Sequence, residues 1–150
     1  MTNPATQPTQ PAQPGETLSV VVEREIAHPP EKIWRALTQP HLIEEWLMKN
    51  DFAPVVGHRF NLRRNPRSDL NIVIDCQVVV VEPNRTLSYT WAAFGLESVV
   101  TWTLTPTSTG THLRMEQSGF RPDQQQAYNG AKYGWQKFIG ALEKILARTE

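Results

Sequence analysis

The chain has 150 residues and a mass of 17.1 kDa. That is the size of one ordinary domain, which is large enough to fold without metal or disulfide staples. Fifteen basic and fifteen acidic residues cancel, and a mean hydropathy of −0.43 is typical of a globular protein. A neutral chain lacks the electrostatic footprint of a nucleic-acid binder, and no apolar run approaches the ~18 residues of a membrane span. We therefore expect neither a nucleic-acid nor a membrane partner.

Cysteine usage and the N-terminal sequence favour a reducing cytoplasm. The single cysteine, Cys76, cannot form an internal disulfide. The first residues show neither the positive start nor the apolar stretch of a signal peptide. The sequence thus predicts a cytoplasmic location.

Residues 1–16 differ in composition from the rest of the chain. They hold four of the twelve prolines, are rich in Gln and Thr, and contain no aromatic residue. Such a segment has nothing to bury and is expected to be a disordered tail. Residues 17–150 contain no internal repeat and are expected to form a single domain.

Hydrophobic periodicity predicts the elements that follow. Alternation over residues 17–27 indicates a first strand, which Pro29 and Pro30 end. Apolar residues three to four apart then predict two short helices, the first ending before Pro40 and the second beginning there. Alternating patterns predict five more strands, at residues 59–64, 70–82, 86–92, 97–105 and 111–118. Short turn signals such as Phe94-Gly95 separate them, so consecutive strands are expected to pair antiparallel.

The last predicted element is a helix over residues 122–148, roughly 40 Å long at 1.5 Å per residue. An antiparallel sheet of this length must either close into a barrel or have its apolar face covered, and the long helix is available to cover it. The predicted fold class is therefore α+β, with a curved six-stranded antiparallel sheet in the order β-α-α-β5-α wrapped around the C-terminal helix. Such a sheet leaves a space between itself and the helix.

These elements resemble the START-like, helix-grip superfamily (SRPBCC, birch-pollen-allergen-like). More narrowly, the chain is similar to bacterial homologues of the heat-shock-protein-90 ATPase activator. The stretches that carry the resemblance, over roughly residues 17–147, are "REIAHPPEKIWRALTQPHLIEEWL", "VVGHRFNL", "VVEPNRTLSYTW", "VTWTLTPTSTGTHLRMEQSGF" and "GWQKFIGALEKIL". The family usually has two adjacent glycines before the second strand, whereas here His58 follows Gly57. The resemblance implies an apolar cavity but no single activity, because members bind lipids or other small ligands, act as cyclases, sequester toxins or assist chaperones.

Strand parity and the helix stripe predict an aromatic inner surface. The candidate ligand-binding residues are Trp34, Leu42, Trp46, Phe60, Cys76, Val78, Tyr89, Trp91, Trp102, Met115, Gln117, Tyr128, Ala131 and Trp135. Large flat rings suit an apolar or aromatic ligand. The alternative interpretation is that the same rings simply fill the core.

Three glycines in the predicted C-terminal helix favour a real cavity. Gly130, Gly134 and Gly140 each cost the helix ~0.5–1 kcal/mol relative to alanine. Close approach of the sheet or of a ligand would offset that cost, and so would a dimer contact through the same face. The oligomeric state, monomer or homodimer, stays open.

Arg24 shares the inward parity of the first strand and is a possible polar anchor for a ligand. A buried arginine needs a carboxylate or a ligand anion. Glu44 or Glu45 on the second short helix is the favoured partner.

Few residues indicate metal or covalent chemistry. His41, Glu44 and Glu45 share a helical face, but a solvated face is the favoured interpretation, and we predict neither a metal nor a cofactor. Cys76 has apolar strand neighbours and is interpreted as a small buried hydrophobe. Arg63, Arg64 and Arg67 are interpreted as a solvated turn.

Small-molecule binding is the leading functional hypothesis. The inward positions offer no carboxylate or histidine for general acid–base work, which disfavours a cyclase or hydratase unless Asp51, His58 or Glu97 reaches in. A chaperone partner is a third hypothesis, suggested only by the resemblance.

Overall fold

The computed structural model describes residues 17–64 and 72–148. The predicted tail at residues 1–16 lies outside the described residues, as does Arg67 of the predicted solvated turn. No helix in the described part of the chain is long and apolar enough to span a bilayer.

The elements follow the predicted order with one addition. Two short helices, α1 (Pro30–Thr38) and α2 (Pro40–Trp46), come after the first strand, and α3 (Gln125–Arg148) closes the chain. The strands are β1 (Leu18–Ile26), β2 (Lys49–Asn50), β3 (Arg59–Arg63), β4 (Val73–Glu82), β5 (Thr86–Ala93), β6 (Leu96–Pro106) and β7 (Thr111–Phe120). The sequence analysis missed β2 because two residues carry no measurable period, so the sheet has seven strands rather than six.

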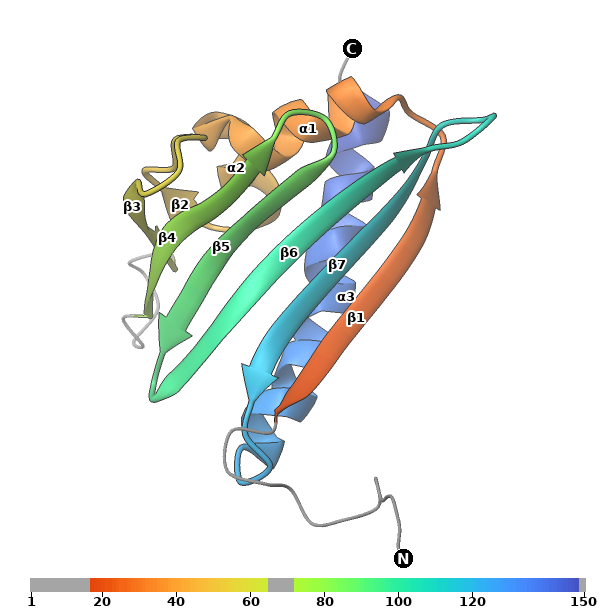
Figure 1. Cartoon of the computed structure of the whole chain (residues 1–150). Coiled ribbons are helices and arrows are strands. Elements are labelled where there is room, and N and C mark those ends of the chain that lie inside the picture. The colour runs from red at the N-terminus through yellow and green to blue at the C-terminus, as the bar shows by residue number, and fades with distance from the viewer. Residues whose placement is uncertain (1–16, 65–71, 149–150) are drawn as a thin grey trace, which may run out of the picture.

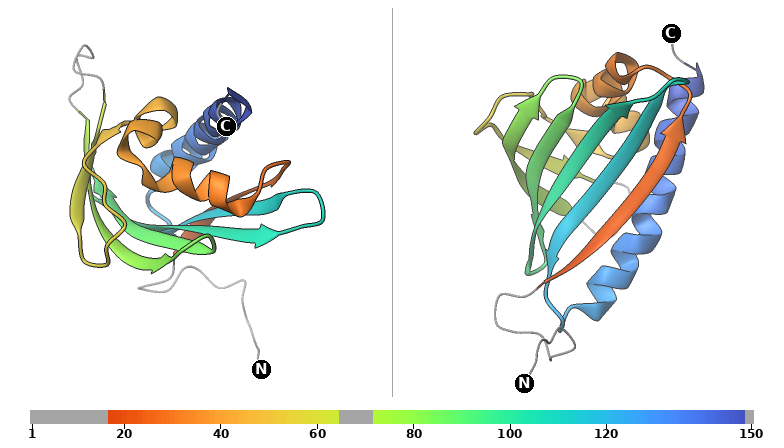
Figure 2. Two further views of the ribbon diagram at one scale, coloured as in Figure 1. Left: turned by 90° about the horizontal axis from the view of Figure 1, so that it is seen from above. Right: turned by 45° about the vertical axis from the view of Figure 1, so that its right-hand side comes forward.

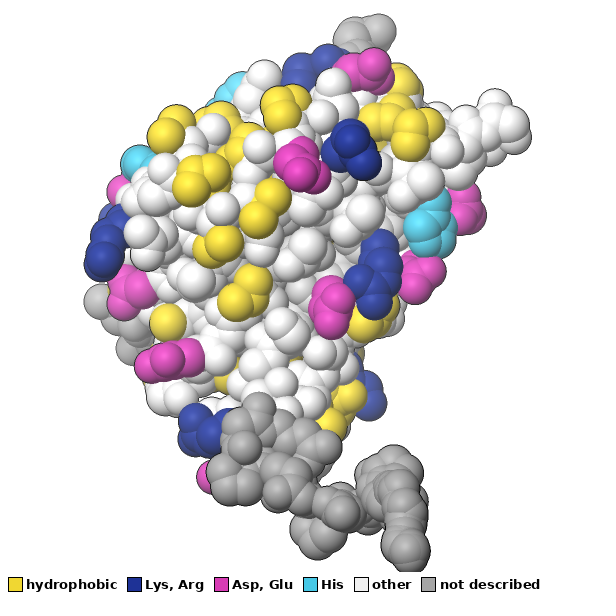
Figure 3. Space-filling model, viewed as in Figure 1, with side chains coloured by type: hydrophobic (Ala, Val, Ile, Leu, Met, Phe, Trp, Pro, Cys, Tyr) yellow, Lys and Arg dark blue, Asp and Glu magenta, His cyan; other side chains and the backbone are white. Residues whose placement is uncertain are grey.

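All seven strands form one antiparallel sheet in the order β1-β7-β6-β5-β4-β3-β2. The sheet curves, and α1, α2 and α3 all lie on its inner side (Figures 1 and 2). This is the predicted helix-grip arrangement. On the outer face, hydrophobic side chains lie singly or in small groups among polar and charged ones (Figure 3).

Two turns show how local chemistry sets the connections. Phe94 and Gly95 both adopt positive φ, 53° and 81°, which is the two-residue turn that matches the twist of a hairpin. Before β3, Gly57 has φ 92°, while His58 adopts no positive φ. His58 instead contacts the Asp51 carbonyl through Nε2 at 2.8 Å. A single glycine is therefore enough for this turn.

The long helix begins three residues later than predicted, after the turn that contains Gln124. The backbone N–H of Tyr128 donates to the Gln124 carbonyl, and the Gln124 side chain accepts from the N–H of Arg121 at 2.8 Å. The C-terminal half of α3 buries Ile139, Leu142, Ile145 and Leu146. In the N-terminal half no side chain before Trp135 is fully buried.

Candidate functional site

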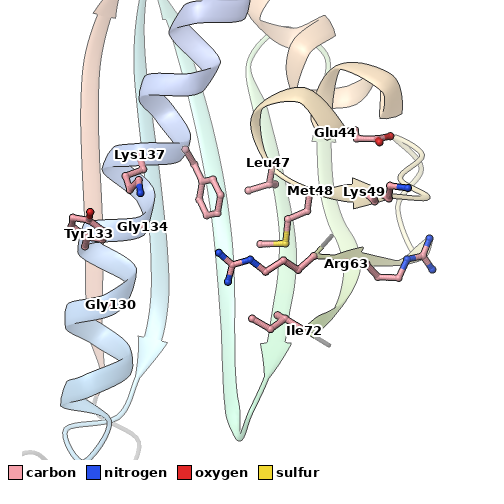
Figure 4. Close-up of a pocket in the computed structure, with 12 residues that line it drawn as sticks. Glu44, Leu47, Met48, Lys49, Arg63, Ile72, Gly130, Tyr133, Gly134 and Lys137 are labelled. Carbon is pink, nitrogen blue, oxygen red and sulfur yellow. The ribbon is translucent and has the colours of Figure 1, made fainter. Parts of the chain in front are cut away.

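A groove with a volume of about 820 Å³ runs beside the N-terminal half of α3. One wall is α3 itself, and the other comes from the end of α2, from β2 and β3, and from the start of β4 (Figure 4). We call it the α3 groove. It is lined by Glu44, Leu47, Met48, Lys49, Arg63, Arg64, Ile72, Gly130, Tyr133, Gly134, Lys137 and Phe138.

The groove exists because two glycines leave the helix wall without side chains. A Cβ added at Gly130 would meet nothing within 4 Å, and one at Gly134 would only touch the Phe138 ring at 4.0 Å. No part of the sheet therefore approaches these two backbones closely. Close approach of the sheet therefore does not offset the loss of helix stability that Gly130 causes.

Two smaller hollows continue the groove along the inner face of the sheet. One of about 370 Å³ shares Ile72 with the groove and extends to Trp91 and Leu96. Another of about 210 Å³ shares Gly130 and Gly134 with it. The second hollow lies over Trp91 and Trp135, so aromatic rings border the inner end of the groove.

A chain of hydrogen bonds fixes the floor of that second hollow. The Trp135 indole N–H donates to Gln117 Oε1 at 2.6 Å, and Gln117 Nε2 donates to Ser98 Oγ at 2.9 Å. Ser98 in turn donates to the Trp91 carbonyl at 2.8 Å. Gln117 is 1% exposed, and each polar atom of its side-chain amide has a hydrogen-bond partner within the protein.

The structure brings four of the fourteen predicted ligand-binding residues to the hollows. Trp91, Gln117, Ala131 and Trp135 line them. None of the fourteen lines the α3 groove itself.

Most of the others pack into the core with one another. Trp102 contacts Trp46 and Trp135 edge to face, with ring centroids 5.5 and 5.7 Å apart. Phe60 and Tyr89 pack against each other at 5.4 Å. Cys76, Val78 and Met115 are likewise buried.

The remaining three predicted residues are only half-buried. Trp34 and Leu42, on α1 and α2, pack against the edge of the core. Tyr128 donates a hydrogen bond to the Ser19 carbonyl at 3.2 Å and packs edge to face on Phe120. Its hydroxyl ties α3 to β1 instead of facing a hollow.

Arg24 does not pair with Glu44 or Glu45, so the predicted partner was wrong. Its guanidinium is about one-third exposed, donates to the side-chain oxygen of Gln136 and lies 4.0 Å from Glu143, both on α3. Neither Glu44 nor Glu45 is its partner, and Glu45 contacts Arg148 at 3.4 Å. Arg24 is on the inward-facing side of β1, but β1 is an edge strand beside α3. Its side chain therefore lies along the side of the helix, where solvent reaches it.

Two buried titratable groups in the core are held in their neutral form. Burial, together with the nearby charges of Asp75 and Asp51, raises the pKa of the Cys76 thiol to about 12. Burial also raises the pKa of Tyr89, against the hydrogen bond that its hydroxyl accepts from the Trp102 indole at 3.0 Å. Among residues 17–64 and 72–148 no carboxylate or histidine is fully buried.

No cluster of three or more His, Cys, Asp or Glu side chains in the described residues is arranged to hold a metal ion. His41, Glu44 and Glu45 are all exposed on α2.

The sequence analysis missed most of the groove. Leu47, Met48 and Ile72 form its apolar wall, across the groove from Gly130 and Gly134 on α3 (Figure 4). The glycines at 130 and 134 were the available signal, because a helical pair four residues apart marks one face.

Comparisons with known proteins agree with this architecture. The family model described as "Activator of Hsp90 ATPase homolog 1-like protein" matches residues 27–147. The crystal structure of protein MLL2253 from Mesorhizobium loti is 66% identical, with a TM-score of 0.83, over 89% of this chain and 99% of that chain. No sequence among curated proteins matches this chain.

Two more distant structures share the fold alone. CalU16 from Micromonospora echinospora is 23% identical with a TM-score of 0.74, over 87% of this chain and 77% of that one. DynU16, a protein in the dynemicin biosynthetic locus, is 24% identical with a TM-score of 0.76, over 86% of this chain and 47% of that one.

Proposed function

This chain belongs to the family of activator of Hsp90 ATPase homolog 1-like proteins, and we propose that it binds a small apolar or aromatic ligand in the α3 groove. The ligand body would lie between the apolar wall of Leu47, Met48 and Ile72 and the glycine face of α3. Its inner end would reach the rings of Trp91 and Trp135.

The observation that carries the proposal is the hollow itself. A volume of about 820 Å³ is within the range of ~300–1,000 Å³ that small-molecule sites occupy. Its α3 wall keeps two glycines in a helix that alanine would stabilise by ~1 kcal/mol each. A bound molecule against Gly130 and Gly134 explains why that stability is forgone.

Binding accounts for the site better than acid–base catalysis. General acid–base chemistry needs a titrating group held within hydrogen-bond reach of the substrate. Glu44, Lys49 and Lys137 are exposed at the groove, whereas the buried Gln117 is engaged by Trp135 and Ser98. A cyclase or hydratase that uses the same groove is the alternative.

The test is a titration with N-phenyl-1-naphthylamine, a neutral apolar dye whose fluorescence rises in apolar surroundings. We expect saturable binding at one site, with amide shift changes in a ¹⁵N spectrum concentrated at Gly130, Gly134 and residues 47–49. Native mass spectrometry of protein purified from its own host is expected to show a retained small molecule. Absence of saturable dye binding, together with an unliganded mass, would refute the proposal.

A chaperone-partner role, which the family description names, predicts a different result. Stoichiometric recovery of the chaperone in a pull-down from lysate, with no dye binding, would favour that role. A cytoplasmic location stays a prediction from the single cysteine and the N-terminal sequence.

A further inference from the structure

We infer that the ligand of the α3 groove is an anion: an apolar body that carries one carboxylate, sulfonate or phosphate group. This inference rests on the proposed function and adds the chemical class of the ligand. It derives from the charges around the groove.

Cations outnumber anions at the groove, although the whole chain has no net charge. Among the described residues, four cations line it, Lys49, Arg63, Arg64 and Lys137, beside one carboxylate, that of Glu44. All are exposed, so water remains available to them until a ligand enters. An imbalance of this kind attracts and orients a negatively charged ligand.

These cations have no acidic partner in the part of the chain that the structure describes. Elsewhere basic groups meet carboxylates: Arg114 contacts Glu116 at 2.9 Å, and Arg121 contacts Asp123 at 3.2 Å. At the groove, the ammonium of Lys137 lies 5.3 Å from the centroid of the exposed Tyr133 ring and meets no carboxylate. Among residues 17–64 and 72–148, no ion pair neutralises these four cations.

The cations come from opposite sides of the same opening. Lys137 is on α3, whereas Lys49 is on β2 and Arg63 ends β3, and the Lys49 side chain points away from α3 (Figure 4). The apolar side chains of Met48 and Ile72 lie between α3 and these strand residues. An anionic group at the cationic rim would thus leave the rest of the molecule against apolar surface, and arginine also offers a carboxylate two parallel N–H donors.

The competing explanation is an ordinary solvated surface, and a matched pair of dyes separates the two. 1-Anilinonaphthalene-8-sulfonate and N-phenyl-1-naphthylamine share one ring system, and only the first carries a sulfonate. We expect the sulfonate to bind more tightly at 20 mM salt, with an advantage that shrinks at 500 mM salt because exposed charges are screened. Decanoate is expected to displace it better than decanol does.

Charge-neutralising variants locate the effect. A unit charge removed at ~6 Å in water weakens binding about threefold, so the combined variant Lys49→Gln, Arg63→Gln and Lys137→Gln should lose about thirtyfold for the sulfonate. Binding of the neutral dye should fall much less than binding of the sulfonate, because it carries no charge for these side chains to attract. Arg85→Gln is the matched control, because the exposed Arg85 follows the end of β4 that is far from Ile72.

Each outcome separates the inference from the function on which it rests. Equal binding of the two dyes, or a loss that is equal in Arg85→Gln and the combined variant, would overturn the inference and leave the binding proposal standing. If neither dye binds, the proposed function fails and the inference fails with it. A sulfonate advantage that depends on salt and disappears only in the groove variant supports both.

Discussion

Gly130 gives a test in which stability and binding move in opposite directions. Replacing it with leucine introduces a side chain where the structure leaves open space on the wall of the α3 groove. Gly140 is the matched control, since it lies on the same helix, its added Cβ would also meet nothing within 4 Å, and it lines none of the hollows described.

The magnitudes follow from helix propensity and from lost contact area. Leucine in place of glycine inside a helix gains ~0.8 kcal/mol, which for a domain of this size raises Tm by about 2–3 °C. If the leucine displaces about 60 Å² of apolar contact, the ligand loses ~1.5 kcal/mol, about tenfold in Kd. Gly130→Leu should therefore be more stable and bind N-phenyl-1-naphthylamine about tenfold more weakly. Gly140→Leu should gain the same stability and bind normally.

The assay combines thermal unfolding followed by circular dichroism with dye titration of the three proteins. A Gly130→Leu protein that is destabilised would show that residue 130 is packed tightly, against the open space in the structure. One that is stabilised but binds the dye with wild-type affinity would show that the dye site is elsewhere. Either result refutes the reasoning that places the ligand against the glycine face.

Three further predictions concern residues outside the groove. Ellman's reagent should react with native Cys76 at pH 8 far more slowly than with the unfolded chain, because burial raises its pKa to about 12; equal rates would contradict this. Gln117→Leu leaves the buried Trp135 indole N–H without its acceptor and should cost about 1–3 kcal/mol in urea unfolding, whereas a neutral effect would show that the bond is dispensable. The hydrogen bonds from His112 to Glu25 and then Glu23 raise its pKa, so an NMR titration should place it above 6.5. The stability that it contributes is complete below pH 6.5 and is lost as pH rises through the native pKa, and a His112→Gln protein with the same pH profile would contradict that assignment.

The sheet was predictable because alternation reports which face of a strand is buried. Cys76, Val78 and Trp102 are all buried in the core, as their parity predicted. Where the pattern is too short it carries no information, and β2 was missed for that reason. In an edge strand, parity predicts the face of the sheet on which a side chain lies but not whether that side chain is buried, as Arg24 shows.

The groove was less predictable because parity cannot tell a filled interior from a hollow one. Trp46, Trp102 and Trp135 face inward as expected, yet they pack on one another. The open volume depends instead on how far α3 stands from the sheet, and that distance is set by side chains on several elements at once. Leu47 and Met48, which follow α2, and Ile72, which precedes β4, come to the same groove only through the tertiary fold.

The two halves of α3 divide the tasks of holding the fold and forming the groove. Ile139 and Leu142 are 0% exposed, so the C-terminal half is fixed by tight packing against the core. Tyr133 is 68% exposed, and before Trp135 the helix contributes to the groove without a fully buried side chain. Changes at positions 130–134 are therefore expected to alter the shape of the groove while the packing of the C-terminal half holds the helix in place.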